Sequence, residues 1–194
     1  MSTSTVIDLQ NEMFQYINSI PEDKKIKQLL CVNYDGRSMD FDGMINNKDY
    51  DNSIFIFNDN YTEHKTSKTG RGNAKIRKYN NYSGLNIPRS FGIPTGHYRT
   101  GYKSLDESIV HINECMYELI NIILRCNYQR LVYSVDSLTN ILIGTSIFNV
   151  SDDVKRYISK CFLILSANGI LNFVNSTGKT YDHKITYDNI NTFK

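Results

Sequence analysis

The feature that most constrains the fold is an alternation of short apolar runs with helical segments. Residues 53–57 read SIFIF, a continuous apolar run typical of a strand buried on both faces of a parallel sheet. Similar runs are SFGIPT at 90–95 and RLVYSVD at 130–136. Because segments with helical periodicity separate these runs, the middle of the chain predicts an α/β layer fold with a mainly parallel sheet.

The helical segments are defined by apolar spacing and by their first residues. Residues 5–19 predict an amphipathic helix that ends before Pro21. The strongest pattern covers 104–126, where Ser104 and Glu107 have the spacing of a capping box. Ser151 and two acidic residues begin another helix over 152–165. Shorter helices are expected over 22–30 and 73–82.

The remaining segments complete a single domain. LLCVNYDG at 29–36 predicts a strand, and Pro94 is expected to end the strand at 90–95. Residues 170–187 alternate in the manner of a β-hairpin. We expect one domain over 1–194, with its core at about 29–166, an N-terminal helical extension at 1–28 and a C-terminal hairpin at 167–194.

Several classes of protein and of site are disfavoured. The four cysteines form no CxxC pair, so reduced, buried thiols are expected. The first residues lack a secretion signal, and no apolar run approaches the roughly 18–20 residues needed to span a bilayer. The four histidines lack metal-ligand spacing. We expect a soluble, intracellular protein with no membrane contact, no metal and no cofactor.

Charge is strongly segregated although the formal net charge is only +2. Nine Lys and Arg residues and no Asp or Glu lie between His64 and Leu105, which leaves 13 basic and 20 acidic residues elsewhere. Such a segment creates a positive potential that attracts anions. The alternative interpretation is an ordinary solvated basic loop.

Polar side chains follow the predicted strands. Asn58, Asp59 and Asn60 end one strand, Thr95 ends the next, and Asp136 ends a third. Ligands of such sheets bind beyond the carboxyl ends of the strands, so these residues are expected at one rim. Asp59 and Asp136 are the carboxylates predicted there and therefore the catalytic candidates, with solvated turn residues as the alternative.

Two loops of small residues follow predicted strands and resemble phosphate-binding loops. Gly70 and Gly72 flank Arg71 before a predicted helix, a combination that lets backbone N–H groups approach an anion. The loop at 144–150 has the same position before the helix at 152–165. The first loop matches neither a Walker A motif nor a full GxGxxG.

Four segments in order resemble the macrodomain family, closest to a group of phage and large-virus non-structural proteins. They are IFIFNDN (54–60), GRGNAKIR (70–77), FGIPTG (91–96) and GTSIFNV (144–150). The resemblance implies a three-layer α/β fold with a mixed, mainly parallel sheet. It also implies binding of ADP-ribose or a related nucleotide, with hydrolysis as a possible activity. The NAAN string of the family is absent, and Asn149 stands where a glycine often follows the aromatic residue.

The resemblance also assigns ligand-binding residues. Asn58 and Asn60 would stand near the distal ribose, and Thr95 would lie at the same rim. The first phosphate loop would be Gly70, Arg71, Gly72, Asn73 and Ala74, and the second would be Gly144, Thr145, Ser146, Ile147 and Phe148.

Two other classes of function stay open at this point. A fold of this kind could be a structural or interaction protein, for example in a virus particle. The basic segment 64–103 is also interleaved with tyrosines, a mixture that can bind single-stranded nucleic acid by stacking.

Overall fold

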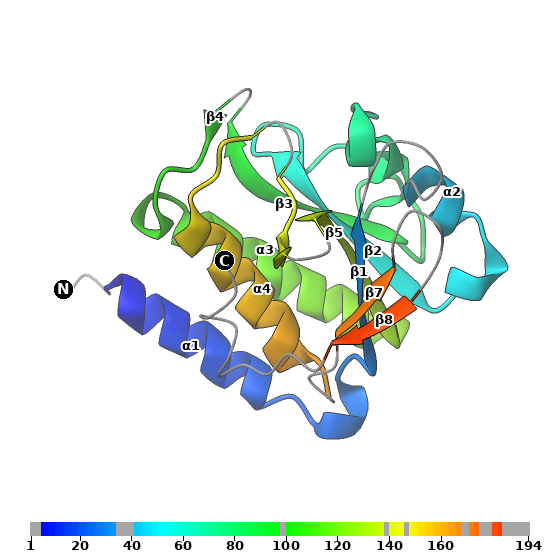
Figure 1. The fold of residues 1–194 in the computed structure, drawn as a ribbon, viewed down its shortest axis with the longest axis horizontal. Helices are drawn as coiled ribbons and strands as arrows, with labels where there is room; N and C mark the ends of the chain where they lie inside the picture. The colour runs from blue at the N-terminus through cyan, green and yellow to red at the C-terminus, as the bar shows by residue number, and fades with distance from the viewer. Residues whose placement is uncertain are drawn as a thin grey trace.

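The protein is built around a mixed, mostly parallel β-sheet (Figure 1). The computed structural model describes residues 5–33, 41–97, 100–137, 140–145, 148–167, 171–174 and 180–183. The strand order is β4-β3-β2-β5-β1-β7-β8, and β6 pairs with β5 off this path. The strands are β1 (Gln28–Asn33), β2 (Ser53–Asn60), β3 (Ser90–His97), β4 (Thr100–Gly101), β5 (Arg130–Ser137), β6 (Asn140–Ile143), β7 (Leu171–Val174) and β8 (Thr180–His183).

Five neighbouring strands, in the order β3-β2-β5-β1-β7, are mutually parallel. Three short strands each pair antiparallel with one of these five. β1 pairs in parallel with β5 and β7, and β2 pairs in parallel with β3 and β5. The strands β4, β6 and β8 pair antiparallel with β3, β5 and β7. The prediction of an α/β fold with a mainly parallel sheet and a terminal hairpin is therefore confirmed.

Helices cover both faces of the sheet. On β2, Ile54 and Ile56 pack into the larger core, whereas Phe55 and Phe57 pack into a smaller one, as the two-residue side-chain period of a strand requires. The larger core contains residues of α1 (Val6–Asn18), α3 (Leu105–Cys126) and α4 (Asp152–Leu165). The smaller core contains residues of α2 (Phe41–Ile45) and of the 3₁₀ helix η3 (Gly72–Tyr79). Two further 3₁₀ turns are η1 (Glu22–Lys24) and η2 (Lys48–Tyr50).

The predicted helix starts are present. The Thr5 hydroxyl accepts a hydrogen bond from the Asp8 N–H at 3.1 Å, and the Asp8 carboxylate accepts one from the Thr5 N–H at 2.9 Å, which completes a capping box at α1. At α3 the Ser104 hydroxyl caps Glu107, as predicted, at 3.4 Å. The Glu107 carboxylate, however, accepts from the N–H of Lys103 rather than from that of Ser104.

Three sequence predictions need correction, and one strand was not predicted at all. The segment 22–30 is the turn η1 followed by the first residues of β1, because Leu29 and Leu30 enter the two cores on opposite faces. Residues 73–82 give a 3₁₀ helix that ends at Tyr79. The strand β6 was not predicted.

The third correction concerns Pro94, which does not end β3. The strand continues to His97. Proline lacks the N–H that a strand donates, so it is tolerated where no neighbour needs that bond. β4 pairs with β3 only at Gly96 and His97, so the described strands leave the outer edge of β3 beside Pro94 unpaired.

The connections between strands leave the sheet on alternate faces. The chain leaves β2 toward η3, on the face of the smaller core, and leaves β5 toward α4, on the face of the larger core. β2 and β5 are neighbours, so their connections leave on opposite faces at one point of the sheet, and α/β proteins bind ligands at the carboxyl edge beside such a point.

Within the described part of the chain, none of the helices has the length and apolar character required to cross a membrane. The four cysteines are free thiols, of which Cys126 is half-buried and the others are buried.

The end of α3 provides a test of local backbone strain. Asn127 follows the helix in the left-handed region, with φ 54° and ψ 44°. An added Cβ costs roughly 1–2 kcal/mol in this conformation, and glycine avoids the cost. We expect Asn127→Ala to be less stable than Asn127→Gly by about that amount in urea unfolding. Both variants lose the side-chain amide of Asn127 and differ only in the Cβ, so equal stabilities would contradict the left-handed backbone conformation at this residue.

Candidate functional site

The carboxyl end of β2 directs two successive side chains to opposite faces of the sheet. The Asn58 amide donates a hydrogen bond to the backbone oxygen of Thr145 at 3.3 Å, in the second predicted phosphate loop. Asp59 points to the other face and contacts Arg77 of η3. One strand end is therefore connected to the loop 144–150 through one residue and to the segment after Gly70 through the next.

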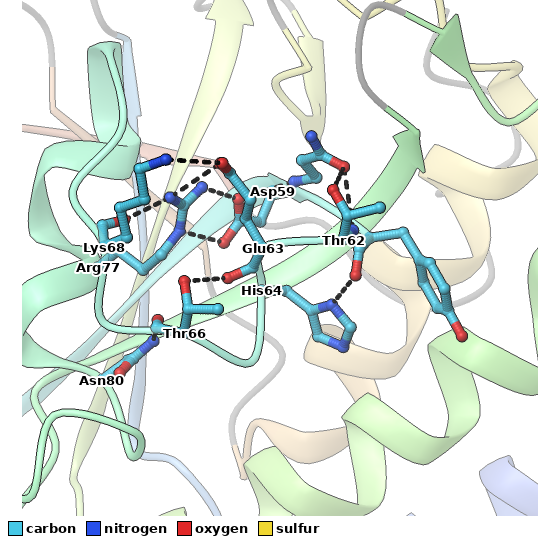
Figure 2. A network of polar contacts seen from close by, with 10 residues as sticks. Asp59, Thr62, Glu63, His64, Thr66, Lys68, Arg77 and Asn80 are labelled. Atoms are coloured by element: carbon cyan, nitrogen blue, oxygen red, sulfur yellow. Dashed lines mark hydrogen bonds and ion pairs between the residues drawn. The ribbon is translucent and has the colours of Figure 1, made fainter.

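Asp59 and Arg77 form a buried ion pair at the centre of a polar network (Figure 2). The Arg77 Nε donates to Asp59 Oδ2 at 2.9 Å, and its Nη2 donates to Oδ1. The Arg77 Nη1 also donates to Glu63 Oε2 at 3.2 Å and to the backbone oxygen of Lys68 at 2.5 Å. The side chains of Arg77 and Asp59 are 2% and 1% exposed. Both oxygens of this predicted catalytic carboxylate are thus bound by the protein itself.

The opposite charges of Asp59 and Arg77 stabilise each other electrostatically. Burial lowers the pKa of Arg77, but the hydrogen bonds and negative charge of Asp59, together with Glu63, outweigh burial and raise it above its usual value. Arg77 therefore remains a cation inside the protein. It is a structural charge, and it does not contribute to the exposed positive potential expected of the basic segment.

Two glycines leave the space that this ion pair occupies. A Cβ at Gly92 of β3 would lie 2.9 Å from the Cβ of Asp59, and a Cβ at Gly70 would lie 3.4 Å from the Arg77 guanidinium. Gly70 was predicted to allow a ligand to approach the backbone. In the structure the groups that approach it are the Ala74 Cβ, 2.7 Å from such an added Cβ, and then the Arg77 side chain.

Several backbone groups of the first predicted phosphate loop form hydrogen bonds with each other. The Gly70 N–H donates to the Ala74 oxygen at 3.0 Å, and the Ala74 N–H donates to the Arg71 oxygen at 3.1 Å. Gly72 has φ +56°, a conformation that favours glycine, and a Cβ there would meet no neighbour within 4 Å. The side chain of Arg71 is exposed. The buried side-chain oxygen of Asn73 has no hydrogen-bond partner.

The second predicted phosphate loop forms hydrogen bonds with β5 and within the loop. The Gly144 N–H donates to the Ser134 oxygen at 2.7 Å, and a Cβ at Gly144 would lie 2.9 Å from the carboxylate of Asp136. Asp136, the other catalytic candidate, is therefore exposed at the foot of this loop. The Thr145 hydroxyl donates to the Phe148 oxygen at 3.1 Å. Ser146 and Ile147 lie outside the described residues.

The two predicted loops pack on opposite faces of the sheet. Ala74 and Ile76 contact the smaller core, whereas Phe148 and Val150 belong to the larger one. The first loop therefore reaches the carboxyl edge of the sheet from the face of the smaller core, and the second loop reaches it from the face of the larger core. Asn60 lies between them on β2, where its side-chain oxygen accepts hydrogen bonds from the N–H and hydroxyl of Thr62.

A β-bulge lies at the end of β3 beside these residues. Asp59 pairs with Pro94 and Asn60 pairs with Gly96, so Thr95 is the extra residue on β3. Thr95 is fully buried, and its hydroxyl has no hydrogen-bond partner. Bulges frequently re-aim side chains next to active sites, and a buried hydroxyl without a partner needs an explanation. Among the described residues predicted for the site, Thr95 and Asn73 both have a buried side-chain oxygen without a partner, and only Thr95 is fully buried.

A cluster of aromatic rings at the same edge was not predicted from the sequence. Three imidazoles surround the ring of Tyr61, with ring centroids at 5.4 Å for His64, 5.4 Å for His97 and 4.5 Å for His111. Tyr102 completes the cluster against His97 at 5.8 Å. The histidines are far apart in sequence, so no spacing could reveal them. No group of three metal-binding side chains was found in the described parts of the chain.

Much of the basic segment is neutralised locally. Lys78 pairs with Asp42 at 3.0 Å, and Arg89 pairs with Asp51 at 3.7 Å. Lys68 lies 3.9 Å from Glu63. Among the described residues of this segment, the exposed cations for which no hydrogen bond or ion pair is seen are Lys65, Arg71 and Lys75.

A groove of about 230 Å³ lies at the opposite, amino edge of the sheet. Its lining includes Lys48, Asp49, Asp51 and Arg130, so its charges largely balance. The Arg130 guanidinium is held by Gln28 at 2.6 Å and by the Asp49 backbone oxygen at 2.9 Å. The Arg130 side chain is therefore held by the protein itself.

No protein-family model, no curated protein and no solved structure matches this chain.

The buried ion pair gives a prediction for stability. Removing one member of a buried pair leaves an uncompensated charge and costs about 3–5 kcal/mol. Arg77→Met should therefore lower the free energy of unfolding by that amount in urea titrations. The neighbouring Lys78→Met breaks an exposed pair and should leave stability nearly unchanged. Similar effects of the two substitutions would contradict the assigned role of Arg77.

His64 gives a prediction for pH dependence. Burial lowers the pKa of His64 below its usual 6.5; Lys65 adds to this effect, while the Tyr61 carbonyl, Asp59 and Glu118 oppose it. The unfolded chain then binds a proton at higher pH than the folded chain, so the contribution of His64 is complete above about pH 6.5 and is lost as the pH falls below it. We expect His64→Gln to reduce the fall in stability between pH 7.5 and pH 5.5. The exposed His97→Gln is the matched control, and an equal reduction in both variants would refute the role of His64.

Proposed function

We propose that the protein binds a phosphate-bearing nucleotide at the carboxyl edge of the sheet, between the ends of β2 and β5. ADP-ribose or a related NAD-derived nucleotide is the first candidate, because the four segments that resemble macrodomains supply the residues at this edge. The observation that carries the proposal is that the chain leaves the neighbouring strands β2 and β5 on opposite faces of the sheet.

The groups at this carboxyl edge suit a polar ligand. Thr95 offers a buried hydroxyl without a partner, and Asn58 holds the Thr145 loop against β2. The exposed side chains of Arg71 and Lys75 come from the segment on the other face and provide charge for phosphate groups. A ligand here would be held mainly by neutral hydrogen-bonding groups, with cations at its periphery.

Hydrolysis of the ligand is a narrower possibility. Asp59 has both carboxylate oxygens bound to Arg77, so a catalytic carboxylate would have to be Asp136, which is exposed at the foot of the second loop. Nucleotide binding is therefore the function proposed, and Asp136 is the residue on which a hydrolytic activity would depend.

The nucleic-acid alternative is weakened by the ion pairs. Among the described residues the uncommitted cations are Lys65, Arg71 and Lys75, so a single strand would meet about three such charges there, which predicts a log–log salt slope of only about −2. Steep salt dependence on single-stranded DNA would favour that alternative over the nucleotide site.

Thr95→Val is the test of the proposed site. Valine has nearly the same shape, and it replaces a hydroxyl that has no partner in the protein, so the variant should be at least as stable as the parent. Loss of a hydrogen bond to the ligand should weaken binding by roughly 0.5–1.5 kcal/mol, or about two- to tenfold. Calorimetric titration with ADP-ribose, NAD and cyclic ADP-ribose isomers measures the affinity.

Ser53→Ala is the matched control, because Ser53 is equally buried, has a hydroxyl without a partner and lies at the amino end of β2. It should leave affinity unchanged. Equal effects of the two variants would move the site away from the carboxyl edge. Absence of binding or thermal stabilisation by any nucleotide would favour a structural role for the protein, since a ligand at 100 times its dissociation constant stabilises the fold by about 2.7 kcal/mol.

A further inference from the structure

The ring cluster at the carboxyl edge contains buried polar atoms that the protein does not satisfy. This Tyr61 cluster consists of Tyr61, His64, His97, Tyr102 and His111. The Tyr102 hydroxyl and the Nδ1 of His111 are shielded from solvent and have no hydrogen-bond partner among the described residues. Tyr102 itself is only 1% exposed. Buried polar groups in native proteins are nearly always paired, so two exceptions in one cluster need an explanation.

The two unpaired atoms face the same part of α3. Burial raises the pKa of Tyr102 above its usual value, and Cys115 and Glu107 of α3 add to the rise. The Tyr102 hydroxyl therefore faces α3 at the level of His111, which is four residues from each of them and on the same side of the helix. Tyr61 lies against this part of α3 as well, because its ring centroid is 4.5 Å from that of His111.

The Tyr61 cluster is contiguous with the proposed nucleotide site. The Tyr102 N–H donates to the Thr95 oxygen at 2.9 Å, which continues the β3–β4 pairing and places these two residues opposite each other. Opposed side chains of an antiparallel pair share one face of the sheet. The second predicted phosphate loop packs on the same hairpin, because a Cβ at Gly101 would lie 2.5 Å from the Asn149 oxygen. A ligand bound by that loop and by Thr95 therefore lies next to the rings.

The rings and the unpaired atoms suit a planar heterocycle. Tyr61 and His111 are half-buried and His97 is exposed, so the cluster reaches the surface of the protein. Aromatic side chains bind flat rings by stacking. A tyrosine hydroxyl donates or accepts a hydrogen bond, and an imidazole nitrogen does either according to its tautomer. The pair therefore serves a ligand edge with one donor beside one acceptor, as nucleobases and carboxamides have.

We propose that the Tyr61 cluster binds the aromatic ring of the nucleotide, with Tyr61 stacking on the ring and with Tyr102 and His111 binding its polar edge. The inference rests on the proposed nucleotide binding and gives the ligand an orientation, with its phosphate groups toward the second loop and its ring over α3. Exposed side chains change rotamer within nanoseconds, so the ring reaches the two buried atoms when His97 turns aside. Adenine and nicotinamide share the required chemistry.

The first test compares ligands with and without a ring. The protein is titrated calorimetrically with AMP, nicotinamide mononucleotide and ribose 5-phosphate. We expect AMP or nicotinamide mononucleotide to bind at least tenfold more tightly than ribose 5-phosphate, and the tighter of the two identifies the ring. Equal affinities for all three would overturn the ring subsite and leave the phosphate-binding site standing. No binding of these compounds or of ADP-ribose and NAD would overturn both.

The second test removes the unpaired hydroxyl. Tyr102→Phe should be at least as stable as the parent, because the lost hydroxyl has no partner in the described structure. It should weaken binding of the ring-bearing nucleotide by about two- to tenfold and leave ribose 5-phosphate unchanged. Tyr128→Phe is the matched control, because Tyr128 is also buried but donates to the Pro88 oxygen at 2.5 Å, beyond the far end of α3.

The control should show the opposite result, with lower thermal stability and unchanged affinity. Tyr61→Leu removes the stacking surface and should weaken the ring-bearing nucleotide roughly tenfold or more, again without an effect on ribose 5-phosphate. Circular dichroism melting should show each variant folded. Parental affinity for the ring-bearing nucleotide in both Tyr102→Phe and Tyr61→Leu would overturn the proposal, even where the parent protein binds nucleotides.

Discussion

A carboxylate at the end of a buried strand is the constraint on which this edge of the structure depends. Asp59 points into the face covered by η3, where water cannot solvate it, so a fixed cation must be supplied. Arg77 supplies that cation and in turn orders Glu63 and the Lys68 backbone. The glycines at positions 70 and 92 provide the space. The shape of the segment from 61 to 80 is thus set by one charge on β2.

The helices and strands could be predicted from the sequence, but the contacts of the Asp59–Arg77 ion pair could not. Apolar period and cap residues define α1, α3, α4 and the parallel strands, because those signals are contained within each segment. The ion pair joins residues 18 positions apart and depends on side-chain direction. Nothing local distinguishes the buried Arg77 from the exposed Lys75 or Lys78 beside it. β6 was missed because its four residues precede a loop of similar composition, and Pro94 was misread because its tolerance depends on an unpaired strand edge.

The sequence predicted the edge of the sheet at which the candidate site lies better than it predicted the contacts of the individual residues. The rule that ligands bind beyond parallel strands placed Asn58 and Thr95 at one edge, where the structure also has them. Thr145, named through the family resemblance, contacts Asn58 there. The two glycine-bearing loops were both expected to bind phosphate groups, and they pack on opposite sides of the sheet because η3 and α4 follow strands whose connections diverge. The Tyr61 cluster joins residues from β3, α3 and two loops, and such a combination has no sequence signature.

The position of β5 has a consequence for how the chain acquires its structure during synthesis. β5 lies between β1 and β2, so the first two long strands to emerge from the ribosome are not neighbours in the sheet. They are joined only when residues 130–137 arrive and pair with both. Until then β2 can pair with β3 alone, and one edge of each partial sheet stays open. Such late, non-local pairing slows folding and exposes strand edges to other chains. The nascent protein therefore depends on its helices to cover the sheet halves until the central strand is inserted.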